Sequence, residues 1–129
     1  MPSAKMHRVL ITGAGGRIGR GLRETLRGVY PVLRLSDLVP ISPARAGEEV
    51  DQTDIADMKS VERMVEGCDG IIHLGGISGE NTRKILEGNI VGLYNTFEAA
   101  RKAGVKRIVM ASSNHAVGFY PRSQRSTTK

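Results

Sequence analysis

Three glycines spaced three residues apart, Gly13, Gly16 and Gly19, carry the clearest chemical meaning in this sequence. They follow the apolar run 8–12 and precede a helical pattern. In that position Gly13 permits a tight turn, Gly16 lets a pyrophosphate approach the backbone, and Gly19 lets the helix pack closely. A glycine pattern alone is also typical of an ordinary strand-to-helix turn, but these flanks favour dinucleotide binding, with phosphates at the helix start. The predicted phosphate-binding residues are Gly13, Gly16, Arg17, Ile18 and Gly19.

Asp37 ends the second apolar run, 18 residues after Gly19. This is close to the spacing at which a carboxylate accepts hydrogen bonds from the adenosine ribose of a dinucleotide. Its charge repels a 2′-phosphate, so NAD is the expected cofactor rather than NADP. Arg17 and Arg34 are cations that favour NADP, although a solvated helix face and a strand-surface charge explain them equally. Asp54, after the third predicted strand, either faces the adenine edge or caps the following helix.

Two polar loops, Leu74-Gly-Gly-Ile-Ser78 and Ala111-Ser-Ser-Asn-His115, are expected at the carboxyl edge of the sheet. Ligands of open α/β folds bind at this edge. The two glycines of the first loop let the backbone approach the second phosphate and ribose. A serine in the second loop can hydrogen-bond a reacting carbonyl or hydroxyl, although serine-rich loops are often simple turns. His73 is interpreted as a core histidine with a hydrogen-bond partner, whereas His115 is better placed for a site.

Strands and helices alternate along the chain. Each predicted strand is a short continuous apolar run, which is typical of a sheet buried on both faces. This order predicts an α/β doubly wound parallel sheet, the Rossmann fold, with right-handed crossovers. The predicted strands are 8–12, 32–36, 49–53, 70–74 and 107–111, and the predicted helices are 17–27, 57–66 and 82–103.

Apolar stripes indicate which helix faces pack on the sheet. In the first helix the stripe is Ile18, Leu22 and Leu26. Asp54 or Asp57 is expected to cap the second helix, and segment 40–47 is the one loose stretch. In the third helix the predicted stripe is Ile85, Leu86, Ile90, Leu93, Phe97 and Ala100.

The composition is that of a single globular domain, with 129 residues, 40% hydrophobic and 25% charged. The single cysteine, Cys68, cannot form an internal disulfide and has no second thiol for a metal site, so it is expected to be structural. No apolar run is long enough to cross a bilayer, and the first residues lack a signal-peptide pattern. We therefore expect a cytoplasmic protein with neither a membrane nor a metal partner.

The net charge of +6 is concentrated at one end of the chain. Residues 101–129 hold seven Lys/Arg and no acid, whereas residues 1–100 hold 12 Lys/Arg and 13 Asp/Glu. A nucleic-acid surface needs grouped cations, preferably interleaved with aromatic residues, and only 4% of the residues are aromatic. No nucleic-acid partner is therefore expected.

Taken together, these residues resemble the extended short-chain dehydrogenase/reductase family, also described as NAD-dependent epimerases/dehydratases, over nearly the whole chain. The segments that carry this family resemblance, beyond the glycines, are Asp54-Ile55, His73-Leu-Gly-Gly76, Asn89-Ile-Val-Gly-Leu-Tyr-Asn95 with Glu98-Ala-Ala100, and Arg107-Ile-Val-Met-Ala-Ser-Ser113. Within the family the similarity is greatest to the uronate dehydrogenase group, in which His73-Leu-Gly-Gly-Ile-Ser78, Gly92-Leu-Tyr-Asn95 and Ala111-Ser-Ser-Asn-His115 occur together.

The resemblance implies an NAD-dependent oxidation of a uronic acid, such as glucuronate or galacturonate, to its aldarolactone. It implies that Ser113 is the serine of the catalytic Ser-Tyr-Lys set. The sugar acid, a small-molecule partner, would be contacted by Ser78, Ser113, Asn114 and His115. The cofactor-binding residues would further include Asp54, Ile55, Leu74, Gly75, Gly76 and Asn89.

One family feature is absent from these 129 residues, the Tyr-x-x-x-Lys pair. Tyr30, Tyr94 and Tyr120 are followed four residues later by Arg, Glu and Gln. Residues 1–129 are therefore expected to be the N-terminal, cofactor-binding portion of a Rossmann domain, incomplete at its C-terminal end and inactive by itself. A nucleotide-sugar epimerase or dehydratase, and a non-catalytic dinucleotide-binding module, are the alternatives. A homo-oligomer is expected, because Leu86, Leu93 and Phe97 are candidates for uncovered apolar surface.

Overall fold

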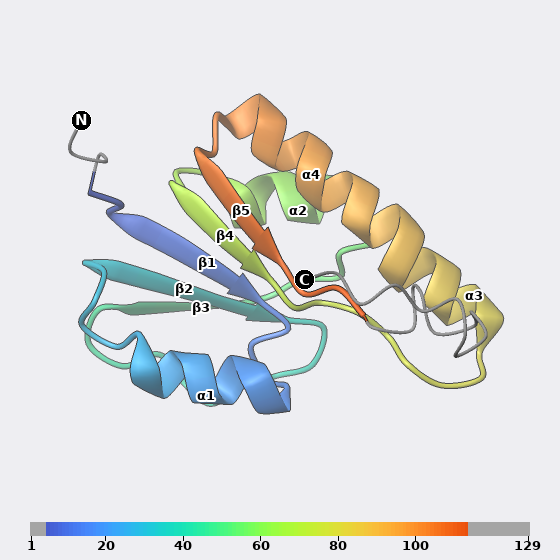
Figure 1. Cartoon of the computed structure of the whole chain (residues 1–129), viewed down its shortest axis with the longest axis horizontal. Helices are drawn as coiled ribbons and strands as arrows, with labels where there is room; N and C mark the ends of the chain where they lie inside the picture. The colour runs from blue at the N-terminus through green and yellow to red at the C-terminus, as the bar shows by residue number, and fades with distance from the viewer. Residues whose placement is uncertain (1–4, 114–129) are drawn as a thin grey trace, which may run out of the picture.

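The computed structural model describes residues 5–113, which form one parallel sheet with helices on both faces. The strand order is β3-β2-β1-β4-β5, so the chain starts at the centre, builds one half of the sheet and then crosses to the other (Figure 1). This confirms the predicted doubly wound fold. The strands are β1 (Arg8–Thr12), β2 (Val32–Asp37), β3 (Glu48–Gln52), β4 (Gly70–His73) and β5 (Arg107–Met110).

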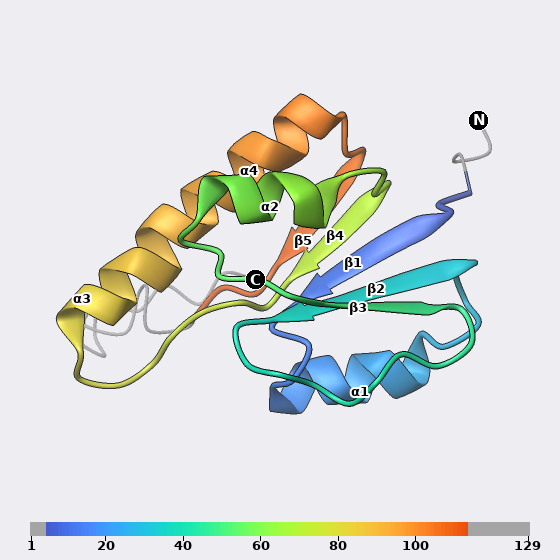
Figure 2. The same ribbon diagram turned by 180° about the vertical axis from the view of Figure 1, so that it is seen from behind.

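The helices divide between the two faces of the sheet. One face carries α1 (Arg17–Thr25), and the other carries α2 (Met58–Val65) beside α4 (Gly92–Ala103) (Figures 1 and 2). The predicted helix 82–103 is continuous, but its middle is a π-helix, η1 (Leu86–Val91), which follows α3 (Thr82–Ile85). Gly104 ends α4 in the left-handed conformation, with φ of 72°, as its glycine predicts.

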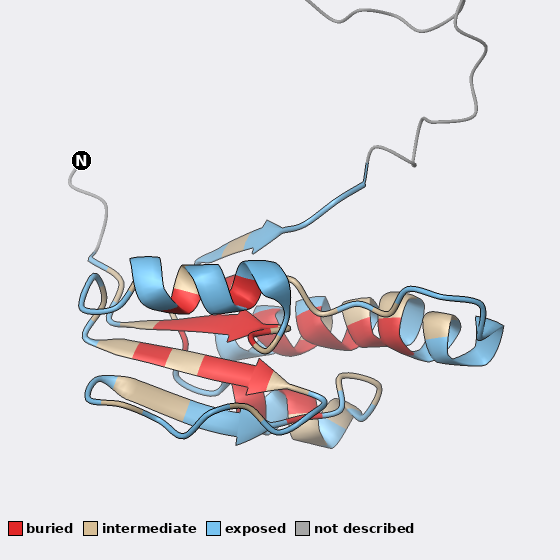
Figure 3. Cartoon of the chain, turned by 90° about the horizontal axis from the view of Figure 1, so that it is seen from below, coloured by how far each residue is buried: buried red, intermediate tan, exposed pale blue. Residues whose placement is uncertain are grey.

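Successive residues of the central strand β1 pack into two separate cores. Leu10 belongs to the core under α2 and α4, together with Val61 and Met64. Val9 and Ile11 belong to the core on the α1 side. The central strands are therefore buried on both faces, whereas β3 and β5 are exposed at the edges (Figure 3). This double burial is why the central strands are apolar runs without alternation.

Two predicted apolar stripes were partly wrong. Ile18 is 62% exposed, because α1 approaches the rest of the chain through Gly19 and Arg23, which are buried. On the long helix, Leu86, Ile90 and Phe97 are exposed. The buried residues of that helix are instead small or polar: Gly88, Gly92, Asn95, Thr96, Ala99 and Ala100. These small residues bring the helix close to its neighbours, so the bulky side chains lie outward.

Three polar or reactive side chains have structural roles. Cys68 is a buried free thiol, and burial raises its pKa, which agrees with the structural role expected for it. His73 is buried with a hydrogen-bond partner, as predicted. Arg34 donates to the Glu49 carboxylate at 2.6 Å and to two carbonyl oxygens at the end of α2. Its guanidinium therefore forms hydrogen bonds to β3 and to the end of α2.

In the part of the chain that the structure describes, no helix is both long and apolar enough to span a membrane.

The segment 40–47, predicted to be loose, is held against α1 by one buried cation. Arg23 donates to the carbonyl oxygens of Ser42 and Pro43 at 3.2 and 2.6 Å. Arg23 also pairs with Glu48 at 2.7 Å, and the side chain of Glu48 is only 1% exposed. The hydrogen bonds from Arg23 lower the pKa of Glu48 to about 2. Because the pKa falls on folding, this pair stabilises the fold above the ordinary value of 4.5 and less as the pH approaches 2.

We predict that Glu48→Ala lowers the free energy of unfolding by about 3 to 5 kcal/mol at neutral pH, because it leaves the Arg23 charge buried without its partner. Glu24→Ala is the matched control. Glu24 pairs with Arg45 at 2.6 Å but is 63% exposed, so solvent screens this pair and its loss should lower the free energy of unfolding far less. Urea denaturation of both variants measures the difference, and equal losses would contradict a buried role for Glu48.

Candidate functional site

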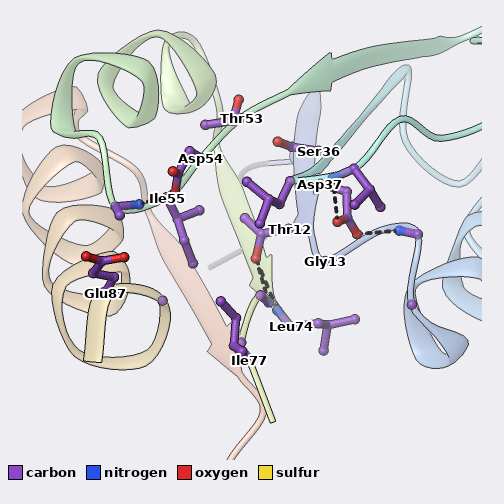
Figure 4. Close-up of a pocket in the computed structure, with 18 of the residues that line it drawn as sticks. Thr12, Gly13, Ser36, Asp37, Thr53, Asp54, Ile55, Leu74, Ile77 and Glu87 are labelled. Atoms are coloured by element: carbon purple, nitrogen blue, oxygen red, sulfur yellow. Dashed lines mark hydrogen bonds between the residues drawn. The ribbon is translucent and has the colours of Figure 1, made fainter. Parts of the chain in front are cut away.

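A cavity of about 520 Å³ opens where the loops diverge beyond the carboxyl ends of the strands (Figure 4). This is the edge at which the sequence places a ligand. The predicted residues that line it are Gly13, Gly16, Asp37, Asp54, Ile55, Leu74, Gly75 and Gly76. The chain direction of a parallel sheet brings these residues together, although they span more than 60 positions of the sequence.

The glycine turn after β1 has no room for side chains where the sequence predicts none. Gly13 has φ of 67°, and a Cβ there would lie 2.8 Å from the carbonyl carbon of Leu74. A Cβ on Gly19 would meet the Gly13 carbonyl oxygen and lie 2.6 Å from the Ala14 Cα. A Cβ on Gly16 would meet just one atom of the described residues, the Gly13 carbonyl oxygen, at 3.2 Å. The cavity therefore reaches the Gly16 backbone.

The N-cap of α1, Gly16, lines this cavity, whereas Arg17, Ile18 and Gly19 of the first turn are absent from its described lining. Gly16 is the N-cap and contributes no side-chain cap, and the first turn holds no acidic residue. Backbone N–H groups at a helix start carry partial positive charge and suit an anion. Arg17 and Ile18, both exposed, begin this turn. The arrangement can therefore bind a phosphate through main-chain donors.

Asp37 ties the ends of two strands together. One carboxylate oxygen accepts from the Gly15 N–H at 2.8 Å, and the other accepts from the Val39 N–H at 3.3 Å (Figure 4). A Cβ on Gly15 would lie 3.1 Å from this carboxylate and 2.8 Å from Ile41 Cγ2. Gly15 is thus a further required glycine, which the three-residue spacing did not single out. The carboxylate lies at the cavity wall with acceptor capacity left for a hydroxyl.

Asp54 and Asp57 have different roles. Asp57 is the N-cap of α2 and accepts from the Ser60 N–H at 3.1 Å and from the Ser60 hydroxyl. The Ser60 hydrogen bonds lower the pKa of Asp57. Asp54 accepts from the Ala56 N–H at 2.9 Å, lines the cavity and does not cap the helix. Of the two alternatives for Asp54, the capping one was wrong.

Two asparagines of the long helix hold the loops that line the cavity. Asn89 accepts from the Ile77 N–H at 2.7 Å and donates to the Ile77 carbonyl at 2.8 Å. Asn95 donates to the carbonyls of Ile55 and Ala56, both at 3.0 Å. Asn89, predicted to bind the cofactor, is absent from the described cavity lining. Its side chain is hydrogen-bonded to the backbone of Ile77. Asn95 ends one of the segments that carry the family resemblance, but no sequence pattern predicts its hydrogen bonds to Ile55 and Ala56.

The cavity also includes two charged residues that sequence reasoning missed, Lys84 and Glu87. They lie three residues apart on the same long helix and therefore on the same helix face. This spacing is the one feature of the sequence from which a shared site could have been predicted. Glu87 also pairs with Arg83 at 2.8 Å. In Figure 4 the Glu87 carboxylate lies on the side of the cavity near Ile55.

Two of the predicted substrate residues are absent from the described lining of the cavity. Ser78 and Ser113 are exposed, and neither is among the described residues that line the cavity. Asn114 and His115 lie outside the described residues. Among residues 5–113, no group of three or more His, Cys, Asp or Glu is arranged to hold a metal ion.

Comparison with known proteins identifies the family. The model of the NAD dependent epimerase/dehydratase family matches residues 9–129. The chain belongs to this family. The resemblance stated from the sequence motifs is thereby confirmed.

Several relatives of this chain are uronate dehydrogenases. The chain is 55% identical to the uronate dehydrogenase of Agrobacterium fabrum, covering 93% of this chain and 46% of that protein. It is 50% identical to the uronate dehydrogenase of Pseudomonas putida, covering 97% of this chain and 47% of that protein. A crystal structure of a variant uronate dehydrogenase from Agrobacterium tumefaciens, complexed with NAD, superimposes with a TM-score of 0.87 at 55% identity, over 93% of this chain and 46% of that chain. The chain thus spans about half the length of the relatives it matches.

We predict that Gly13→Ala weakens NAD binding more than tenfold, because its Cβ would displace Leu74 and Gly75 from the cavity wall. Gly28→Ala is the matched control. Gly28 has φ of 75°, so both variants carry the same left-handed backbone strain, but a Cβ on Gly28 would meet no atom of residues 5–113 within 4 Å. Titration calorimetry on both variants separates the two effects. Equal affinity losses would show that strain, not the contact with Leu74, is responsible.

Proposed function

We propose that the whole protein containing this chain is an NAD-dependent dehydrogenase that oxidises a uronic acid at its ring carbon-1 hydroxyl to an aldarolactone. The observation that carries the proposal is the 50–55% identity to uronate dehydrogenases across 93–97% of the chain. The cavity supports it, because a glycine turn, a helix N-terminus and a strand-end carboxylate line one space. The substrate class comes from the relatives, and the cofactor class from the residues themselves.

The residues present fit NAD. The space around Gly16, which a larger side chain would fill, and the first-turn amides of Arg17 and Ile18 would receive the diphosphate. Asp37 would accept hydrogen bonds from the adenosine ribose. Asp54 and Ile55 would face the adenine, and the second glycine loop, Leu74 to Gly76, would approach the second ribose. When bound, NAD supplies the hydride acceptor.

The remaining residues would position the sugar and its departing proton. Oxidation removes the carbon-1 hydrogen with its electron pair as hydride, while the hydroxyl proton passes to a base, and the carbon becomes the lactone carbonyl. We propose that Ser113 hydrogen-bonds this hydroxyl, and that Ser78, Asn114 and His115 contact the sugar acid. The 129 residues contain no tyrosine followed four positions later by lysine, so the base is proposed to lie outside them.

We also propose that the 129-residue chain, taken by itself, forms a homo-oligomer. The long helix exposes a row of apolar side chains, with Leu86 at 53%, Ile90 at 62%, Tyr94 at 65% and Phe97 at 42% exposure. On β5, Val109 and Met110 are also exposed, at 56% and 42%. Covering several large apolar side chains contributes roughly 1.5 to 3 kcal/mol each, which favours association.

We predict that NAD binds in preference to NADP and that Asp37→Ala narrows the difference by about tenfold, equivalent to ~1.4 kcal/mol. The reason is the repulsion between the Asp37 carboxylate and a 2′-phosphate. Asp37→Asn is the control that removes the charge but retains one acceptor oxygen for the Gly15 N–H, at the loss of the longer hydrogen bond from the Val39 N–H. Calorimetric titration with both cofactors checks the prediction. Equal affinities of the unmutated protein for NAD and NADP would exclude this role for Asp37.

We predict that the whole protein forms NADH with glucuronate or galacturonate, whereas the 129-residue chain forms none, because its residues lack the proton acceptor. In the whole protein, Ser113→Ala should lower kcat by about 100-fold or more while the affinity for NAD is retained. An absorbance assay of NADH formation on both chains is the test. Turnover by the short chain would mean that the base lies within it, and activity only on nucleotide sugars would favour the epimerase or dehydratase alternative.

A further inference from the structure

Thr12 and His73 end two neighbouring strands and face each other across the sheet. They are paired in register as the last residues of β1 and β4. Both are buried, with 1% and 3% of their surface exposed. The Thr12 hydroxyl oxygen lies 2.8 Å from His73 Nδ1. The contact joins the residue before the glycine turn to the residue before the second glycine loop.

The hydrogen bonds of the Thr12 hydroxyl determine which atom carries the proton. Its oxygen accepts from the Gly75 N–H at 3.1 Å and from the Leu74 N–H at 3.2 Å, and the Leu74 N–H also donates to the Thr12 carbonyl oxygen at 3.2 Å (Figure 4). A hydroxyl has two lone pairs and one hydrogen. With both lone pairs taken by amides, its own hydrogen is directed to His73, and Nδ1 must be the acceptor. The imidazole is therefore neutral and carries its proton on Nε2.

The same hydroxyl sets the distance between the two loops of the cavity. A Cβ on Gly75 would lie 3.2 Å from the Thr12 hydroxyl and 3.5 Å from His73 Cε1. On the other side, a Cβ on Gly13 would lie 2.8 Å from the Leu74 carbonyl oxygen and 2.9 Å from the Gly75 nitrogen. The second loop thus lies between Thr12 and the glycine turn, with almost no free space. Turning the hydroxyl away would release the Gly75 amide and leave the Leu74 amide only the Thr12 carbonyl oxygen as its acceptor, so this loop could shift.

We propose that His73 is a positioning residue of the dinucleotide site, which acts by holding the Thr12 hydroxyl as an acceptor for the Leu74 and Gly75 amides. The proposal rests on the proposed function, since it assumes that this cavity takes NAD. His73 itself does not line the cavity among the described residues, so it acts through Thr12 and not on the ligand. Burial lowers the pKa of His73, which favours the neutral ring that the arrangement needs.

Four variants separate this role from simple packing. Thr12→Val and His73→Leu keep most of the volume but remove the acceptor or its orienting partner. Thr12→Ser keeps the hydroxyl, and His73→Asn places a side-chain oxygen near the position of Nδ1. We expect the first two to weaken NAD binding roughly tenfold, and the last two to stay within about threefold of the unmutated protein. Titration calorimetry measures affinity, and thermal melting confirms that each variant is folded.

A spectroscopic arm needs no cofactor. Long-range ¹H–¹⁵N spectra of the histidine ring in the unmutated protein should show an unprotonated Nδ1 and a protonated Nε2. In Thr12→Val the amide resonances of Leu74 and Gly75 should shift, and in Thr12→Ser they should return. A ring protonated on Nδ1, or amides that do not respond to Thr12→Val, would overturn the proposal.

The two proposals fail in different ways. If the unmutated protein does not bind NAD, the proposed function is overturned, and so is the role of His73 in NAD binding. If it binds NAD and folded Thr12→Val binds equally well, only the role of His73 and Thr12 is overturned. If His73→Asn binds as weakly as His73→Leu, the acceptor at Nδ1 is not what matters, and the proposal is likewise overturned.

Discussion

Gly13 lies so close to the backbone of Leu74 and Gly75 that a Cβ on it would be within 2.9 Å of three of their atoms. The rest of the cavity depends on this contact, because it brings the turn after β1 beside the loop after β4. The start of α1 then faces the space between them. Gly19 completes the arrangement by letting α1 approach Ala14. Close packing of the backbone therefore shapes a site for an extended phosphate ligand.

Each loop around this contact is held by a polar side chain from a neighbouring element. The Asp37 carboxylate accepts a hydrogen bond from the Gly15 N–H of the glycine turn. The Asn89 side chain is hydrogen-bonded to both the N–H and the carbonyl of Ile77. Asn95 holds the segment before α2, and Thr12 holds the loop after β4. Loops beyond the strand ends lack the regular backbone hydrogen bonds of a sheet, so hydrogen bonds from side chains take their place. The rigidity that a cofactor site needs comes from these hydrogen bonds.

Much of the fold follows from local sequence. The five strands agree with their predicted ranges within one residue at each end, because apolar runs between glycine and polar turns are local features. The stripe on the long helix was predicted less well. An ideal helical period places Leu86, Ile90 and Phe97 inward, but a π-turn over Leu86–Val91 changes the phase, and small residues form the packed face. Which face of a helix is buried depends on the shape of what it packs against.

The sequence by itself determined which local features are present: three glycines and Asp37 at spacings that predict a dinucleotide site, and the segments that carry the family resemblance. These are short-range patterns, and their physical meaning lies in turn geometry and in the start of one helix. Only the tertiary structure decided that Thr12 and His73 share a hydrogen bond across 61 residues, that Asn95 reaches Ile55, and that Lys84 and Glu87 join the cavity. Such pairs depend on strand register and helix packing, which no local spacing encodes.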